Sequence, residues 1–227
     1  MEGPALSATG QDAGLPRRAA GRLRRIGRRA RRLADPIRLP EATAPLEQWQ
    51  RIPMNGAVDA YLAALPAAEL RAAEISGDTH AGRGWKEYSS LNFPEFDIGA
   101  PVTDPGRFDV VICEQVLEHV PDPFAAASNL RELCAPGGRV IVSTPFLIRI
   151  HELPMFDMGD YWRFTPRGLR TLLERGGLQV DEVGAWGNRD VVVGNFDRWP
   201  RYRRWHSLRN EPDLPVQVWA FARRAAD

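Results

Sequence analysis

Two apolar runs with a helical segment between them constrain the fold of this chain most strongly. The runs are Phe108–Cys113 and Arg139–Ser143, and each is nearly continuous in apolar side chains. Such runs are typical of strands buried on both faces of a parallel sheet. The segment between them, Pro123–Cys134, has a helical composition and stops at Pro136-Gly137-Gly138. This strand–helix–turn–strand unit predicts a doubly wound α/β sheet.

Further elements are expected on both sides of this unit. Helices are expected at Gly56–Leu65 and at Pro166–Arg175, the second with Thr165 as its N-cap. The segment 187–214 is rich in Arg and Trp and is expected to be a long functional loop. The remaining strands are predicted at Leu70–Ile75, Tyr88–Leu91, Leu178–Val183 and Val216–Phe221.

The net charge of +1 conceals a strongly basic N-terminal segment. Residues 17–32 contain nine arginines and no acid, which leaves the rest of the chain acidic. We therefore expect a disordered basic arm and linker at 1–46, broken by prolines, and one domain at 47–227. A solvated tail is the favoured interpretation of the arm, and a contact with an anionic membrane surface is the second. The acidic domain argues against a nucleic-acid partner.

Composition also indicates the compartment. No run approaches eighteen apolar residues, and Met1–Leu15 contains no apolar core of a secretory signal. The two cysteines, Cys113 and Cys134, have no partner cysteines nearby. We therefore expect a cytoplasmic protein without a metal site.

Three motifs resemble one known family. The first runs Phe108-Asp-Val-Val-Ile-Cys-Glu-Gln-Val-Leu-Glu-His-Val-Pro-Asp-Pro, and the second runs Ala135-Pro-Gly-Gly-Arg-Val-Ile-Val-Ser-Thr-Pro-Phe. Both resemble the type 11 family of class I S-adenosylmethionine-dependent methyltransferases. The third, His151-Glu-Leu-Pro with Asp160-Tyr-Trp-Arg-Phe-Thr-Pro, resembles a subgroup associated with surface-glycan synthesis. The resemblance covers roughly residues 70 to 222.

The resemblance implies a Rossmann-like, three-layer α/β/α sheet with a C-terminal antiparallel strand. It also implies S-adenosyl-L-methionine as cofactor and a small-molecule or glycan acceptor. In open α/β sheets, ligands bind beyond the carboxyl ends of the strands. The residues expected to bind the cofactor there are Glu74, Ser76, Gly77, Asn92, Asp97, Glu114 and Gln115.

Four further residues are candidates for the acceptor side. Methyl transfer depends largely on positioning of the acceptor, and a general base matters only if the acceptor loses a proton. His151 and His119 are the candidate catalytic residues, although a lone histidine is more often structural. Tyr161 and Arg163 are candidate substrate contacts, against the alternatives of a packed aromatic and a surface arginine.

The first half of the cofactor site departs from the family pattern. The family's acid and glycine-rich loop is replaced by the segment 73–80, with Ser76 at the first loop glycine. Only residues 76–87 separate the first two strands, so the first crossovers are expected to be short. Asn92 stands where the family has an acid. A catalytically silent, methyltransferase-like binding module is therefore the alternative. A nicotinamide-dependent oxidoreductase ranks low because no Gly-x-Gly-x-x-Gly follows a strand.

Overall fold

The computed structural model describes residues 47–154, 158–197 and 199–226. The arm and linker expected at 1–46 lie outside these residues, as does Arg198. Among the described residues, no helix has the length and apolar content needed to cross a membrane.

The domain is built on one six-stranded sheet in the order β2-β1-β3-β4-β6-β5. Strands β1 to β4 pair in parallel, and β6 lies antiparallel between β4 and β5. All six predicted strands, the C-terminal antiparallel one among them, are confirmed, but β4 begins at Cys134 rather than Arg139 and so includes the predicted turn Pro136-Gly137-Gly138. The strands are β1 Arg71–Ile75, β2 Glu87–Leu91, β3 Phe108–Glu114, β4 Cys134–Pro145, β5 Gln179–Trp186 and β6 Gln217–Arg223.

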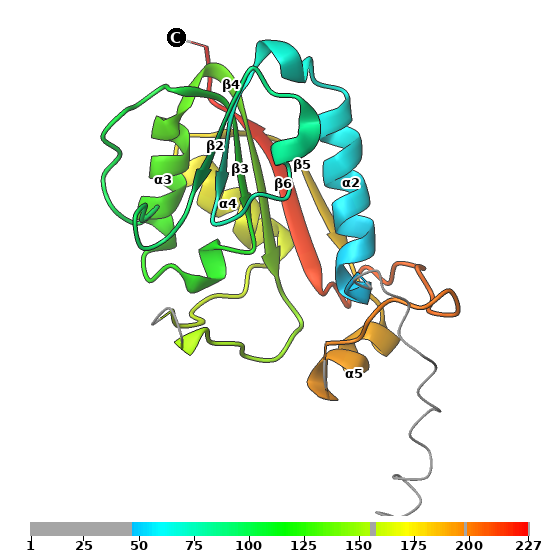
Figure 1. Cartoon of the computed structure of the whole chain (residues 1–227). Coiled ribbons are helices and arrows are strands. Elements are labelled where there is room, and N and C mark those ends of the chain that lie inside the picture. The colour runs from blue at the N-terminus through cyan, green and yellow to red at the C-terminus, as the bar shows by residue number, and fades with distance from the viewer. Residues whose placement is uncertain (1–46, 155–157, 198, 227) are drawn as a thin grey trace, which may run out of the picture. The chain divides into compact units, whose positions relative to one another are not determined.

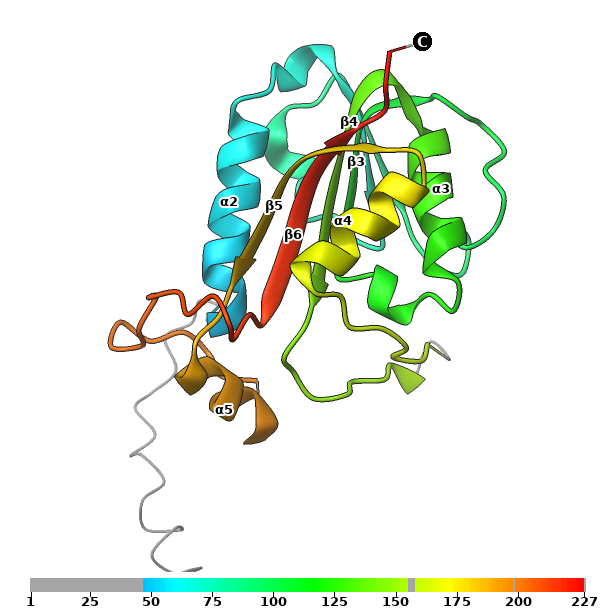
Figure 2. The ribbon, with the colours of Figure 1, turned by 180° about the vertical axis from the view of Figure 1, so that it is seen from behind.

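Helices cover both faces of the sheet, as Figures 1 and 2 show from opposite sides. Helix α2, Ile52–Ala63, lies on one face, and α3, Pro123–Leu133, and α4, Pro166–Arg175, lie on the other. The predicted three-layer α/β/α architecture is confirmed. The other described helices are α5, Arg189–Asp197, and four 3-10 turns: η1 Trp49–Arg51, η2 Ala67–Glu69, η3 Ala81–Arg83 and η4 Leu117–His119.

The central strand β3 supplies side chains to two separate apolar cores. Val111 and Cys113 face the core under α3 and α4, whereas Val110 and Ile112 face the core under α2. All four are fully buried, because successive side chains of a strand point to opposite faces. The continuous apolar run in the sequence therefore reflects a strand covered on both sides.

Local capping explains where two helices begin. Helix α3 follows Asp122, whose carboxylate accepts hydrogen bonds from the backbone N–H groups of Phe124 and Ala125. Helix α4 follows Thr165, whose hydroxyl accepts from the N–H of Gly168. Each has proline in its first turn, where a missing N–H is tolerated. The predicted bounds of α4 are confirmed.

Two other predictions were wrong in part. Helix α2 begins at Ile52 rather than Gly56, because Pro53 occupies the first turn without breaking the helix. The segment 187–214 is not all loop, since it contains α5, Arg189–Asp197. Its run of β-branched valines disfavours a helix, but the side chain of Asn188 accepts a hydrogen bond from Val191 N–H and caps it.

The first crossovers are short, as predicted. Between β1 and β2 the chain forms only the 3-10 turn η3. Between β2 and β3, residues 92–107 are fully described and contain no helix. The chain therefore reaches the central strands without the helices that usually connect parallel strands.

Gly184 tests the pairing of β5 with β6. A Cβ at this position would lie 2.2 Å from Cε2 of Trp219, its cross-strand partner. Gly184→Ala should lower the free energy of unfolding by about 1 to 3 kcal/mol through overpacking. The matched control Gly56→Ala, in α2 with nothing within 4 Å of its Cβ, should raise it by about 0.5 to 1 kcal/mol. Denaturant titration measures both, and equal effects would contradict the assigned packing.

Candidate active site

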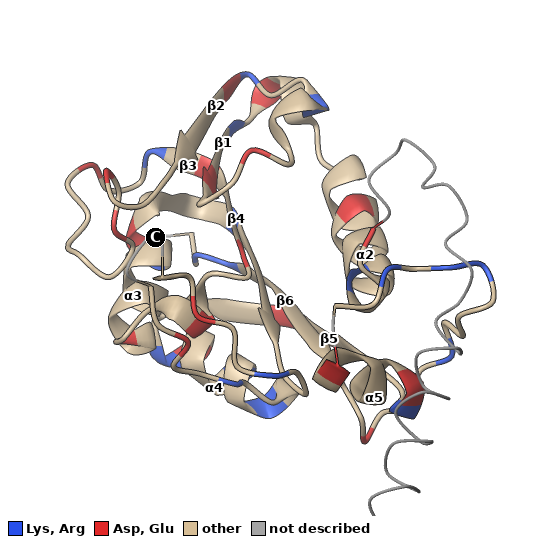
Figure 3. Ribbon diagram, turned by 60° about the horizontal axis from the view of Figure 1, so that its bottom comes forward, with Lys and Arg blue, Asp and Glu red and all other residues tan. Residues whose placement is uncertain are grey.

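The candidate site lies at the carboxyl ends of β1 and β3. From β1 the chain leads outward to β2, whereas from β3 it leads to β4 on the other side. Such a reversal of strand order opens a crevice that commonly binds ligands. Figure 3 brings this edge of the sheet toward the viewer. A cavity of about 180 Å³ occupies it, lined by residues from four segments: 75–76, 93–98, 116–121 and 158–161.

The cavity combines apolar walls with a carboxylate. Phe93, Phe96 and Ile98 line it from the loop after β2. Between them, Asp97 uses Oδ1 to accept a 2.8 Å hydrogen bond from the N–H of Gly99. Ser76 also lines the cavity, and its φ is 56°. An apolar slot with one placed acid suits a flat heterocycle that carries an amino group.

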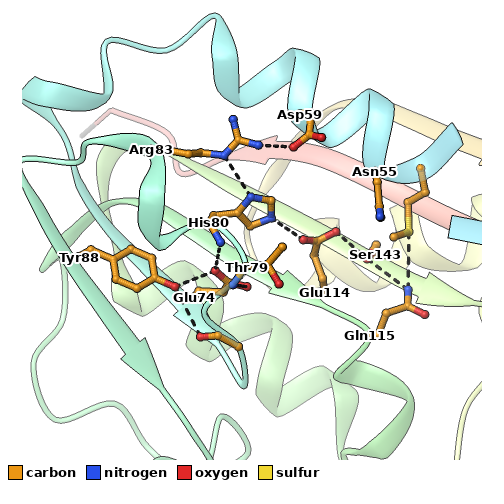
Figure 4. A network of polar contacts seen from close by, with 12 residues as sticks. Asn55, Asp59, Glu74, Thr79, His80, Arg83, Tyr88, Glu114, Gln115 and Ser143 are labelled. Carbon is orange, nitrogen blue, oxygen red and sulfur yellow. Dashed lines mark hydrogen bonds and ion pairs between the residues drawn. The ribbon is translucent and has the colours of Figure 1, made fainter. Parts of the chain in front are cut away.

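The Glu74 carboxylate closes the short loop after β1 (Figure 4). It is 3% exposed. It accepts hydrogen bonds from the N–H groups of Thr79 (3.1 Å) and His80 (2.9 Å) and from the Tyr88 hydroxyl (2.7 Å). A Cβ at Gly77 would lie 2.7 Å from Glu74 Oε1. Gly77 is thus required by its contact with this carboxylate, and the loop holds its shape without a helix.

His80 joins this loop to β3. Its Nδ1 accepts from Arg83 Nε at 3.1 Å, so Nε2 carries the proton and donates to Glu114 Oε2 at 2.7 Å. Arg83 also pairs with Asp59 of α2 (Figure 4). Neither His80 nor Tyr88 was predicted from the sequence, because no local pattern signals contacts made across two loops.

Gln115 ties three strands together at the same edge. Its backbone is left-handed, with φ at 57°. Its Nε2 donates to Gln217 Oε1 at 2.9 Å and to Ser143 Oγ at 3.2 Å. Asn92, at the end of β2, is exposed and donates from Nδ2 to Ser90 Oγ. The predicted cofactor residues therefore gather at one edge of the sheet, although several are occupied by contacts within the chain.

Glu118 and His119 belong to the 3-10 turn η4. Glu118 is fully buried, and neither carboxylate oxygen has a hydrogen-bond partner among the described residues. Burial raises the pKa of Glu118 to about 8, so the group is largely protonated at neutral pH. His119 lines the cavity and is 7% exposed. Its Nδ1 donates to the carbonyl oxygen of Gly159 at 2.6 Å, which leaves Nε2 without the proton in the neutral ring.

The loop after β4 carries the other acceptor-side candidates. The rings of His151 and His119 meet edge to face, with centroids 5.0 Å apart. Tyr161 lines the cavity and is 54% exposed. The Arg163 guanidinium binds both carboxylate oxygens of Asp160 and the carbonyl oxygen of Arg149. His119 and Tyr161 thus line the cavity, His151 contacts the ring of His119 without lining the cavity, and Arg163 is engaged within the loop.

A family model described as a methyltransferase domain matches residues 40–183. The chain belongs to this family.

Curated relatives of this methyltransferase-domain chain include enzymes named ubiquinone biosynthesis O-methyltransferase. That of Pseudomonas aeruginosa is 38% identical over 123 residues, which cover 50% of each chain. That of Xylella fastidiosa is 30% identical over 113 residues, covering 41% of this chain and 45% of the relative. In these matches the chain spans about half the length of the curated relatives.

Solved structures share the fold at low sequence identity. A protein from Listeria monocytogenes described as an S-adenosylmethionine-dependent methyltransferase is 12% identical, with a TM-score of 0.51 over 75% of this chain and 99% of its own. Phosphoethanolamine N-methyltransferase 2 of Haemonchus contortus, solved with S-adenosyl-L-methionine, is 12% identical, with a TM-score of 0.52 over 77% of this chain and 53% of its own. The Rossmann-like methyltransferase fold is confirmed, and the glycan subgroup stays a prediction.

Tyr88→Phe tests the loop closure at Glu74. The pKa of the Tyr88 phenol is raised by burial and by the hydrogen bond to Glu74, so the hydroxyl remains a donor at all ordinary pH values. Its removal should lower the free energy of unfolding by about 1 to 3 kcal/mol, as for a hydrogen bond to a charged group. Tyr161→Phe, at an exposed tyrosine, should change it by less than about 0.5 kcal/mol. Equal values in urea titration would rule out this role of Tyr88.

Proposed function

We propose that this chain transfers a methyl group from S-adenosyl-L-methionine to a hydroxyl group of a small-molecule acceptor. The observation that carries the proposal is the cavity at the ends of β1 and β3, which is lined by both Asp97 and His119. Membership in the methyltransferase domain family supports it. When bound, the cofactor supplies a methyl group already activated on a sulfonium.

The cavity residues fit the parts of the cofactor. Phe93, Phe96 and Ile98 offer apolar faces for the adenine ring, and the Asp97 carboxylate can accept from its amino group. At the end of β2, Asn92 can hydrogen-bond a ribose hydroxyl. Ser76, which lines the cavity, and the adjoining Gly77 are proposed to lie beside the methionine part. We infer that Glu74 acts chiefly by shaping the Ser76–Gly77 turn, since its oxygens are engaged by the loop.

The acceptor is placed on the side of His119, His151 and Tyr161. A small molecule with a hydroxyl group is favoured, because the relatives that this chain matches along about half of their length are named O-methyltransferases. A glycan is the narrower version of this proposal and rests on the resemblance of residues 151–166 alone. Arg163 holds the Asp160 carboxylate, so its effect on acceptor binding is indirect.

The second candidate function is a catalytically silent binding module. Two features of the loop after β1 favour it. The loop lacks the family's glycine pattern, and the Glu74 carboxylate accepts hydrogen bonds from N–H groups of the loop itself. Catalysis is favoured by His119, which lines the cavity, and by His151, whose ring contacts that of His119. Binding and transfer measurements separate the two.

We further propose a cytoplasmic location and no nucleic-acid partner. The location is supported by Cys113 and Cys134, which are buried and unpaired, as in a reducing compartment. The acidic balance of the domain supports the second point. A peripheral membrane contact through the arginines of 17–32 concerns residues outside those described.

Calorimetry with S-adenosyl-L-methionine tests the cofactor site. The wild-type chain should bind with measurable heat, and Asp97→Asn should weaken binding about tenfold, equivalent to about 1.4 kcal/mol, through loss of a charged acceptor. Asp104→Asn is the matched control, since Asp104 is 69% exposed and pairs with Arg107 just before β3 starts. Its affinity should equal that of the wild type.

No binding at millimolar cofactor would refute the enzyme proposal, and equal loss in both variants would refute the role of Asp97. Incorporation of labelled methyl then decides the acceptor class. Transfer to catechol rather than to methyl glucoside is expected, and the reverse preference would favour the glycan version. Binding without transfer to any phenol or sugar would favour the silent module.

A further inference from the structure

We propose that the loop 201–210 docks on an anionic lipid surface, with Trp205 as its apolar anchor and its arginines on the lipid phosphates. The loop follows α5 and lies beside the start of α2, in orange-red in Figures 1 and 2. None of the residues of 201–210, all of them described, lines the cofactor cavity, so this inference does not depend on methyl transfer. It concerns a different segment from the arginines of 17–32.

The charges of the 201–210 loop are all of one sign. The loop contains four arginines and no aspartate or glutamate. Three of these arginines, Arg203, Arg204 and Arg209, are exposed, and their guanidinium groups form no hydrogen bond or ion pair with the described part of the chain. By contrast, Arg107 and Arg170 each pair with an acid. Three unpaired guanidinium groups on one loop create a local positive field.

Buried side chains of the domain fix the backbone of this loop. The carbonyl oxygens of 207–209 all accept hydrogen bonds from them. Trp49 Nε1 donates to the first at 3.1 Å, and Trp186 Nε1 donates to the second at 3.0 Å. Asn188 Nδ2 donates to the first and the third, at 3.2 and 3.1 Å. All three donors are buried, so the loop is held in shape before any partner binds, which lowers the entropy cost of binding.

The side chains of the loop divide into an inner and an outer set. The ring of His206 stacks on Trp49, with centroids 4.1 Å apart, and Tyr202 packs against the core under α2. In the outer set, Trp205 is 70% exposed and Leu208 is 42% exposed, together with the arginines. The loop therefore presents an indole and a leucine to solvent among unpaired guanidinium groups.

An anionic bilayer is the partner that engages both kinds of side chain. Indole rings favour the interface between headgroups and acyl chains, where one end of the ring is apolar and the other is wet. Leu208 adds aliphatic surface that the acyl layer can cover. Guanidinium groups bind phosphate oxygens, and anionic headgroups supply them over the whole surface. Single-stranded nucleic acid could stack on Trp205, but it has no apolar layer to receive Leu208.

Flotation of the full chain with lipid vesicles tests the proposal. The nine arginines of 17–32 would bind anionic vesicles by themselves, so the parent protein is the full chain with glutamine at those nine positions. This parent should float with vesicles of phosphatidylcholine and phosphatidylglycerol but not with phosphatidylcholine alone. Its binding should fall as salt is raised, because salt screens contacts between exposed charges.

Two sets of substitutions in the parent separate the apolar and the charged contributions. Trp205→Ala should weaken vesicle binding about tenfold, through loss of the buried indole area. Arg203→Gln combined with Arg204→Gln should weaken it about tenfold or more, through loss of two contacts with anionic headgroups. Vesicles should also shift the tryptophan emission of the parent to shorter wavelength, and this shift should be lost in Trp205→Ala. The replaced side chains are exposed, so the variants should fold like the parent.

The matched controls lie on α3 and α4. Arg167→Gln combined with Arg175→Gln removes two exposed arginines that also have no ion pair within the described chain, and Phe124→Ala removes a half-exposed aromatic ring. Both controls should bind vesicles like the parent.

Equal losses in the loop and the control variants would overturn the proposal, because binding would then follow net charge or overall apolar surface. A parent that does not float with anionic vesicles, or an emission shift that persists in Trp205→Ala, would overturn it too. Loop-dependent binding of poly(A) RNA without binding of vesicles would replace the lipid surface by a nucleic acid.

Discussion

The hydrogen-bonded Glu74 carboxylate is the interaction on which the site depends. A longer connection between β1 and β2 would usually contain a helix. Here the Glu74 carboxylate holds the short loop in place, because it accepts hydrogen bonds from two N–H groups of the loop and from the Tyr88 hydroxyl of β2. Position 77 must be glycine, because a Cβ there would collide with Glu74 Oε1. The hydrogen bond between His80 and Glu114 also fixes this loop against β3. The cavity wall formed by Ser76 is therefore set by buried polar contacts, whose loss is expensive in a low-dielectric interior.

The sequence predicts most of the fold because its signals are local. Continuous apolar strands, prolines in first turns and the Asp122 and Thr165 caps specify their elements within a few residues. Helix α5 was not predicted, because its valines favour strands. It begins after Asn188, whose side chain caps it within an otherwise irregular segment. Short-range capping can thus override propensity where no periodic pattern appears.

The site was predictable only in part. Strand ends place Glu74, Glu114 and Gln115 at one edge, which parallel topology alone dictates. Contacts such as Tyr88 with Glu74 or Asp160 with His151 depend on loops that approach each other in space. Asp160 even lies inside the third motif, yet no spacing rule specifies its contact with His151, nine residues away.

The central claim is that the cavity between β1 and β3 is the cofactor site. A crystal structure of the chain with S-adenosylhomocysteine tests it most directly. The adenine ring should lie between the Phe93–Ile98 loop and Val116–Val120, with its amino group on Asp97 and its sulfur on the side of His119. A nucleoside bound elsewhere, or a sulfur on the side of the cavity away from His119 and His151, would contradict the account.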